Sequence, residues 1–256
     1  MDTSEIDNGT IESLLTEIES TDSPGKTLSG ICKISQLYMD GLISSPKQKE
    51  KNELQQRTLD ALMRCGTLSA RAVYDGRTEV LDYVKTNILE NSEVLKRYCG
   101  RNISRSRYLE GDKPALMNFR KDIRMFALDH KIDTVIAISA GGFEPAFVAS
   151  IALQDCDILP IRLSKYLKSD SNVRFPESCA GAYIRDKLRG KAVLIADDSM
   201  LSGLTMRKAM EFAAANGAKE IYGTAVEILA SECVNPPQKE DYKKYGDTLI
   251  FEYSER

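Results

Sequence analysis

Histidine is almost missing from this chain of 256 residues, which contains only His130. Zinc sites built on histidine and Ser-His-Asp catalytic triads both depend on imidazole groups, so we expect neither here. His130 comes just before a segment that we predict to be a strand. We therefore interpret it as a residue at a helix end and not as a catalytic group.

Long apolar runs and paired cysteines are also missing. No run of about 18 apolar residues occurs, so we expect no membrane span. The first residues, MDTSEIDNGTIESLLTEIES, are acidic and lack the basic-then-apolar pattern of a secretion signal. The six cysteines form no CxxC pair. We therefore expect reduced thiols and a cytoplasmic location.

A strong charge of one sign is the third absence. The 35 Lys and Arg residues nearly balance the 38 Asp and Glu residues, and the net charge is -3. This balance argues against an overall basic surface of the kind that binds nucleic acid. The segment 101–107, RNISRSR, is locally basic. We interpret it as a solvated loop, with a phosphate or nucleic-acid contact as the alternative.

Two patterns divide the chain. From residue 28 to about residue 98, apolar residues recur at three- and four-residue spacing, which predicts helices. The first 20 residues predict a short acidic helix or a frayed end, and a further helix is predicted over 113–129. After His130, four short apolar runs predict strands at 134–138, 158–163, 192–196 and 220–229. Helical stretches follow the first and the third run, and the stretch 164–190 after the second run is polar. A last strand-like segment covers 248–253.

Strands that alternate with helices predict a parallel sheet that is covered by helices on both faces. The nearly continuous apolar character of the strands also favours a sheet buried on both sides. We therefore predict an α/β fold with a helical N-terminal extension. The predicted boundaries are 1–110 for the helical region and 111–256 for the α/β domain.

The segment Val193–Thr205 carries the clearest chemistry. It runs from a strand through Asp197 and Asp198 into a turn of small residues and a helix start. Ligands of open α/β sheets bind at the carboxyl ends of strands, where adjacent carboxylates can hold sugar hydroxyls or a hydrated Mg²⁺. Backbone N–H groups at the helix start bind anions, and the hydroxyls of Ser202 and Thr205 add donors. The segment therefore predicts a site for a sugar phosphate.

The same segment resembles the phosphoribosyl-diphosphate binding motif of type I phosphoribosyltransferases. In that family, four apolar strand residues precede two acids and a loop rich in Thr, Ser and Gly that holds the 5′-phosphate. Leu201 stands where the family usually has Thr, Ala or Asp, and Leu204 replaces a residue that is commonly small. The phosphate-binding residues that the resemblance implies are Ser199, Met200, Leu201, Ser202, Gly203, Leu204 and Thr205.

A second segment, 135–146, is similar to the short glycine-containing loop that holds the diphosphate in this family. In the xanthine- and guanine-type enzymes the loop reads Ser-Arg-Gly-Gly, and here Ala140 stands at the Arg position. The diphosphate-binding residues that the resemblance implies are Ser139, Ala140, Gly141 and Gly142. The family often has a basic residue where the next strand ends, so Arg162 and Lys165 are further candidates.

The resemblance implies a phosphoribosyltransferase-like core and an enzyme that transfers ribose 5-phosphate from phosphoribosyl diphosphate to a nitrogenous base or related acceptor. Asp197 and Asp198 would hold the ribose hydroxyls directly or through Mg²⁺, the expected cofactor. A loop over about 165–185 would close over the site. Leu201 occupies the place of an acidic general base in some members, which leaves the acceptor itself or Glu144 to supply one. The expected partners are phosphoribosyl diphosphate and a base or nucleotide, in a homo-oligomer.

Other functions stay open at this point. A non-catalytic protein would bind a phosphoribosyl ligand or nucleotide and regulate a partner, which Ala140 and Leu201 favour. An effector would bind a protein or nucleic acid through the N-terminal helices, for which the basic segment 101–107 is the only sequence support. A chance match to an unrelated α/β phosphate-binding protein is the last alternative.

Overall fold

The computed structural model describes residues 10–44, 53–99, 113–139, 141–163, 173–176, 181–200, 203–228 and 242–253. In its N-terminal part, helices follow one another as predicted, including a short first helix capped by Thr10. These elements are α1 (Ile11–Ser20), α2 (Pro24–Ser44), α3 (Glu53–Tyr74), the short 3-10 helix η1 (Thr78–Val80), α4 (Leu81–Glu90) and α5 (Ser92–Tyr98). Within the described residues, each helix is too short or too polar to span a bilayer.

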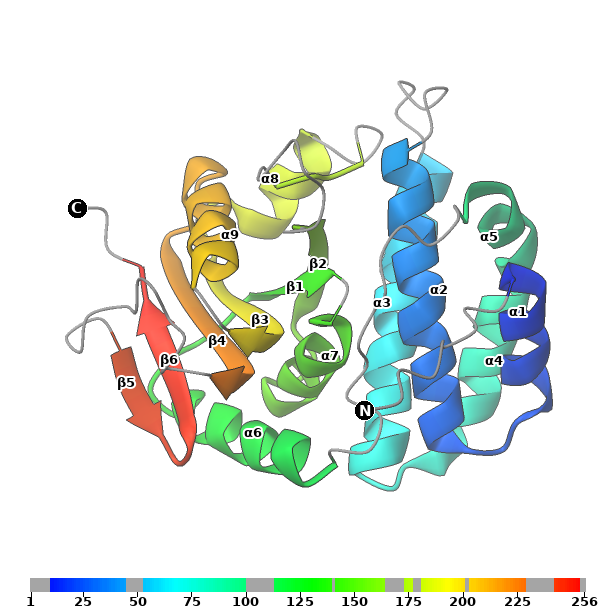
Figure 1. The fold of residues 1–256 in the computed structure, drawn as a ribbon, viewed down its shortest axis with the longest axis horizontal. Helices are drawn as coiled ribbons and strands as arrows, with labels where there is room; N and C mark the ends of the chain where they lie inside the picture. The colour runs from blue at the N-terminus through cyan, green and yellow to red at the C-terminus, as the bar shows by residue number, and fades with distance from the viewer. Residues whose placement is uncertain are drawn as a thin grey trace, which may run out of the picture.

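The remaining described residues form a six-stranded sheet with the order β2-β1-β3-β4-β6-β5 (Figure 1). Its strands are β1 (Thr134–Ser139), β2 (Asp157–Arg162), β3 (Ala192–Met200), β4 (Glu220–Ile228), β5 (Tyr242–Tyr245) and β6 (Thr248–Glu252). The first four strands in this order pair in parallel, and β6 and β5 pair antiparallel. The predicted α/β fold with a parallel core is confirmed, and an antiparallel pair extends the sheet at one edge.

Helices cover both faces of the sheet, as predicted. They are α6 (Lys113–Phe126), α7 (Phe143–Ala152), α8 (Ala182–Leu188) and α9 (Leu204–Ala215). The crossover from β1 to β2 leads toward the β2 edge of the sheet. The crossovers from β2 to β3 and from β3 to β4 lead toward the opposite edge. Because parallel crossovers are right-handed, α7 lies on one face of the sheet, and α8 and α9 lie on the other.

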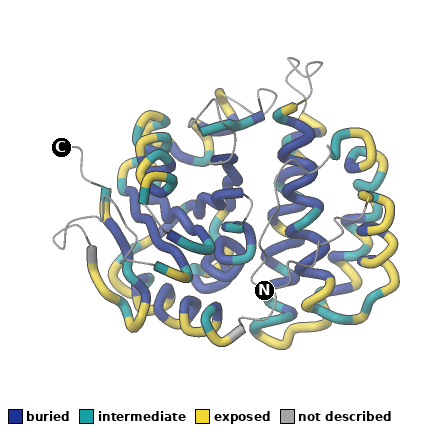
Figure 2. Tube along the Cα trace, viewed as in Figure 1, coloured by how far each residue is buried: buried dark blue, intermediate teal, exposed yellow. Residues whose placement is uncertain are grey.

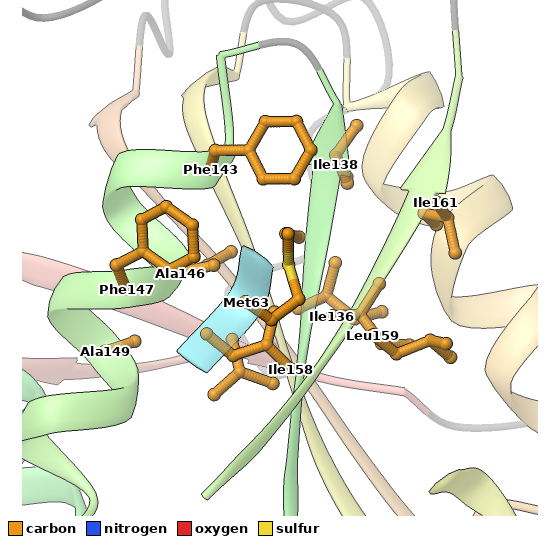
Figure 3. Close-up of a cluster of buried hydrophobic side chains, with 14 of the residues drawn as sticks. Met63, Ile136, Ile138, Phe143, Ala146, Phe147, Ala149, Ile158, Leu159 and Ile161 are labelled. Carbon is orange, nitrogen blue, oxygen red and sulfur yellow. The ribbon is translucent and has the colours of Figure 1, made fainter. Parts of the chain in front are cut away.

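The N-terminal helices form a further layer on the outer side of α7 (Figure 1). A Cβ at Gly66 of α3 would lie 2.1 Å from the Phe147 ring of α7, so the missing side chain lets the two helices approach closely. Met63 of α3 lies with Ile136 and Ile158 of the sheet in one apolar cluster (Figure 3). Figure 2 shows buried residues both in the sheet and in α2 and α3, and their apolar side chains belong to one cluster. The helical extension and the sheet therefore share one hydrophobic core.

Three elements differ from the predictions. Strand β3 continues to Met200, because its pairing with β4 extends as far as Ile228. Helix α8 lies within a polar stretch that we predicted to be a loop, and buried Tyr183 and Leu188 explain its stability. Strand β5 was not predicted, because its sequence YKKY has no apolar run.

Candidate functional site

Asp197 and Asp198 lie within β3, near its carboxyl end. The pairing of β3 with β4 continues past them to Met200 and Ile228, so the backbone around both acids is extended. Successive side chains of a strand point to opposite faces, and the two acids differ in exposure. Asp197 is buried, with 8% of its surface exposed, and Asp198 is half-buried.

Backbone N–H groups orient both carboxylates. The N–H of Asp198 donates to Asp197 Oδ1 at 2.9 Å, and the N–H of Ser199 donates to Asp198 Oδ1 at 2.8 Å. Hydrogen bonds to an ionised acceptor are about twice as strong as neutral ones. The strand backbone therefore restricts both side chains without help from a ligand.

The turn between β1 and α7 approaches Asp198 closely. A Cβ added at Gly141 would lie 2.2 Å from Asp198 Cγ and Oδ2. A Cβ at Gly142 would lie 2.6 Å and 2.7 Å from the backbone oxygens of Ile138 and Ala196. Both distances are shorter than real Cβ contacts. The structure thus brings the two segments singled out in the sequence into contact. A side chain at Gly142 would meet backbone, whereas one at Gly141 would meet the Asp198 carboxylate.

The start of helix α9 follows strand β3 and its two acids in the chain. Gly203 precedes it with a φ of 70°, the left-handed conformation that glycine adopts without strain. The first N–H groups of a helix have no intrahelical partner and form the positive end of its dipole. Thr205 lies in this first turn, beside Leu204, which is 50% exposed. The helix start therefore offers donors for an anion at the same segment as the two acids.

Four of the residues implied by the resemblance cannot be placed. Ala140, Lys165, Leu201 and Ser202 lie outside the described residues. Their roles stay predictions.

Arg162, a candidate for the diphosphate, is buried at the end of β2, with 6% of its surface exposed. Its Nε donates to Asp40 Oδ1 of α2 at 2.8 Å, and its Nη1 donates to the Ser139 carbonyl at 3.0 Å. Burial raises the pKa of the Asp40 carboxyl, and the Arg162 guanidinium opposes that shift. The Arg162 backbone pairs with the Arg174 backbone, and this pairing holds a described part of the loop that we predicted to close over the site. These contacts connect α2 with the last residue of β1.

Glu144, the candidate general base, lies in the first turn of α7. Its Oε1 accepts a hydrogen bond from the Tyr74 hydroxyl of α3 at 2.7 Å. Burial and the nearby Glu144 raise the pKa of Tyr74, so the phenol stays protonated and donates. The sequence reasoning found neither Tyr74 nor Asp40. The only signal for Asp40 was an acid within the apolar stretch of α2.

The carboxylates of Asp197 and Asp198 could hold Mg²⁺ only if a bound ligand supplied further oxygen atoms. Among the described residues, no three His, Cys, Asp or Glu side chains lie together as a ready metal site. Asp197 and Asp198 supply carboxylate oxygens, and Mg²⁺ is usually bound through one or two carboxylates, water and substrate phosphates. The donor set therefore suits a magnesium ion that arrives with a phosphorylated ligand.

His130 lies near the start of β1, whereas the two acids lie near the carboxyl end of the parallel strand β3. His130 is therefore at the opposite edge of the sheet from the acids. Its ring stacks on Phe126 with centroids 4.5 Å apart. Its Nδ1 and Nε2 lie 3.0 Å and 3.3 Å from the hydroxyls of Tyr222 and Tyr245. These contacts agree with the predicted role at a helix end.

A family model and two solved structures are similar to this chain. The family model described as the phosphoribosyl transferase domain matches residues 115–251, more than half of the chain. A purine phosphoribosyltransferase from Pyrococcus horikoshii OT3 is similar at 24% identity and a TM-score of 0.41, over 52% of this chain and 84% of that one. A hypoxanthine phosphoribosyl transferase from Trypanosoma cruzi is similar at 15% identity and a TM-score of 0.41, over 54% and 87%. No curated protein matches. At these scores the two solved structures carry no argument about function.

Proposed function

The chain belongs to the phosphoribosyl transferase domain family, and we propose that it transfers ribose 5-phosphate from phosphoribosyl diphosphate to a nitrogenous base or a related acceptor. The observation that carries this proposal is the contact between Gly141 and Asp198. This contact places the turn between β1 and α7, which could bind a diphosphate, beside Asp198, which could bind the hydroxyls of a ribose. A ligand that carries both groups on one sugar would engage both segments.

The acids would bind the ribose. Asp198 is half-buried, and its carboxylate is oriented by the N–H of Ser199. Asp197 is oriented in the same way by the next N–H group. Carboxylates accept hydrogen bonds from the 2′- and 3′-hydroxyls and favour the positive charge that develops at the anomeric carbon as the diphosphate leaves.

Backbone amides would bind the phosphates. The first turn of α9, with Thr205, would hold the 5′-phosphate. The turn at Gly141 and Gly142 would hold the diphosphate through its backbone, which glycine leaves uncovered because it has no side chain. Anchoring both ends of the ligand fixes the anomeric carbon between them, and such positioning is a main source of rate enhancement.

Magnesium would neutralise the phosphate charge when it is bound with the ligand, and Asp197 and Asp198 would be its protein partners. In the reaction, the bond from the anomeric carbon to the diphosphate oxygen breaks, and a bond to the acceptor nitrogen forms. The proton on that nitrogen passes to another basic atom of the acceptor or to Glu144. Tyr74 donates to Glu144 Oε1 and orients this carboxylate.

The experiment that tests this proposal measures diphosphate release and nucleotide formation with phosphoribosyl diphosphate, Mg²⁺ and a panel of purine, pyrimidine and related acceptors. We expect turnover with at least one acceptor. The double variant Asp197→Asn/Asp198→Asn should lose ligand binding and turnover but keep its cooperative unfolding. Asp82→Asn, a change of the same kind on the exposed face of α4, serves as the control. Unchanged affinity in the double variant would contradict the site assignment.

A further inference from the structure

We propose that the N-terminal helical layer is part of the phosphoribosyl diphosphate site, with Asp40 and Tyr74 as positioning residues for the turn between β1 and α7. This inference rests on the proposed function. It assigns a role to the helical extension that neither the motif nor the family match includes, because the match begins at residue 115. The argument comes from two contacts, one on each side of the turn.

The first contact holds the residue before the turn. Arg162 donates from Nη1 to the carbonyl of Ser139, the last residue of β1, at 3.0 Å. The same guanidinium donates from Nε to Asp40 Oδ1 of α2 at 2.8 Å. Asp40 and Arg162 are 4% and 6% exposed, respectively. A buried carboxylate thus fixes the guanidinium, and the guanidinium fixes the end of β1.

The second contact holds the residue after the turn. Tyr74, the last residue of α3, donates to Glu144 Oε1 in the first turn of α7 at 2.7 Å. Tyr74 is itself held, because Arg120 of α6 donates to its carbonyl at 3.0 Å and also bonds to Asp75. The end of α3 is therefore tied to both α6 and α7 beside the turn.

The turn needs such support because its own described residues offer little. Gly141 and Gly142 have no side chains to pack, and glycine loses more conformational freedom on folding than any other residue. Gly142 is held through its backbone alone, which donates to the Ile138 carbonyl at 2.9 Å and accepts from the Ala146 N–H at 3.0 Å. Since Gly141 rests against Asp198, a shift of the turn would also displace the acid proposed to bind the ribose.

The test compares Tyr74→Phe with a matched control, Asp155→Asn. Tyr74→Phe removes one polar contact between α3 and the α/β part, and Asp155→Asn weakens another by removing its negative charge. Asp155 bonds to Arg71 beyond the far end of α7, about 15 Å along that helix from the turn. Tyr74→Phe should weaken phosphoribosyl diphosphate binding about tenfold in calorimetry with Mg²⁺, which corresponds to about 1.4 kcal/mol. Asp155→Asn should change the affinity by less than about twofold, even where it lowers the melting temperature equally.

A measurement without ligand separates this inference from the proposed function. Amide hydrogen exchange should quicken in peptides that cover residues 138–146 of Tyr74→Phe and should stay unchanged there in Asp155→Asn. Asp40→Asn keeps the shape of the side chain and loses the charge opposite Arg162. It should also quicken exchange in the peptides that cover residues 138–146. Equal exchange in all three variants would overturn the positioning role whether or not the wild type binds. No binding by the wild type, with faster exchange in Tyr74→Phe, would instead overturn the proposed function alone.

Discussion

Gly141→Ala is the sharpest test of how the site is built. A Cβ at this position would lie 2.2 Å from Asp198 Cγ, whereas ordinary contact begins at 3.4 Å. The turn or the acid must therefore move by about 0.8 Å to relieve the clash and by about 1.2 Å to reach ordinary contact. The carboxylate is the easier group to displace, because it is a half-buried side chain and the turn is backbone. The variant should therefore fold with Asp198 out of place.

The expected magnitudes separate effects on stability from effects on function. Inserting one methyl group into a packed region costs about 1–3 kcal/mol, which a domain of ordinary stability tolerates. A displacement of about 1 Å at a reacting group can lower the rate about 100-fold. We therefore expect kcat/KM to fall by about 100-fold while the protein still unfolds cooperatively.

The assay needs two control variants that carry the same chemical change. Gly25→Ala lies in the exposed first turn of α2, where the nearest atom to the new Cβ is Ser23 Oγ at 4.0 Å, and it should leave activity unchanged. Gly142→Ala places its Cβ against backbone oxygens, so it should lower the melting temperature more than Gly141→Ala does. Wild-type kinetics in Gly141→Ala would refute the contact with Asp198 as the organising feature of the site.

Four further results are expected. Excess chelator should abolish turnover and restored Mg²⁺ should recover it; full activity in chelator would count against a metal role. Deleting residues 1–100 should uncover the fully buried Phe147, whose exposure alone costs about 1.5–3 kcal/mol. The fragment should then bind a hydrophobic dye and lack a sharp thermal transition, and a cooperative fragment would contradict the shared core. Burial raises the pKa of the Cys65 thiol to about 12, so iodoacetamide at pH 8.5 should modify Cys65 only in urea that unfolds the chain. Because the raised pKa favours the protonated folded state, stability should fall as pH rises above about 9.

The sheet could be predicted because its strands carry a local signal. Each parallel strand is a short apolar run bounded by turn residues, and β1 is buried over its full length from Thr134 to Ser139. The positions of the two acids also followed, since the carboxyl ends of parallel strands meet at one edge. Their contact with the turn could not be read from the sequence. It depends on β1 and β3 being neighbours, which only the folded sheet determines.

The role of the helical layer had no local signal at all. Helical periodicity predicts a buried face, but it does not say which element covers that face. Asp40 and Arg162 are separated by 122 positions, and Tyr74 and Glu144 by 70. Such pairs become visible only when α2 is packed against β2 and α3 against α7. The sequence pattern therefore described the helices as an extension, whereas the structure makes them a layer of the same folded body.

The pair of Asp40 and Arg162 also argues that this layer contributes more than burial. Moving two charges out of water costs several kcal/mol for each ion, so a buried pair adds little net stability, and apolar residues of similar volume often stabilise a core as well or better. A purely structural interface between α2 and β2 would thus be served equally well by two apolar side chains. An apolar pair could not donate a hydrogen bond to the Ser139 carbonyl, as Arg162 does. The ion pair with Asp40 fixes the direction in which the Arg162 guanidinium donates. Its Nη1 donates to the carbonyl oxygen of Ser139, the residue that precedes the turn proposed to bind the diphosphate.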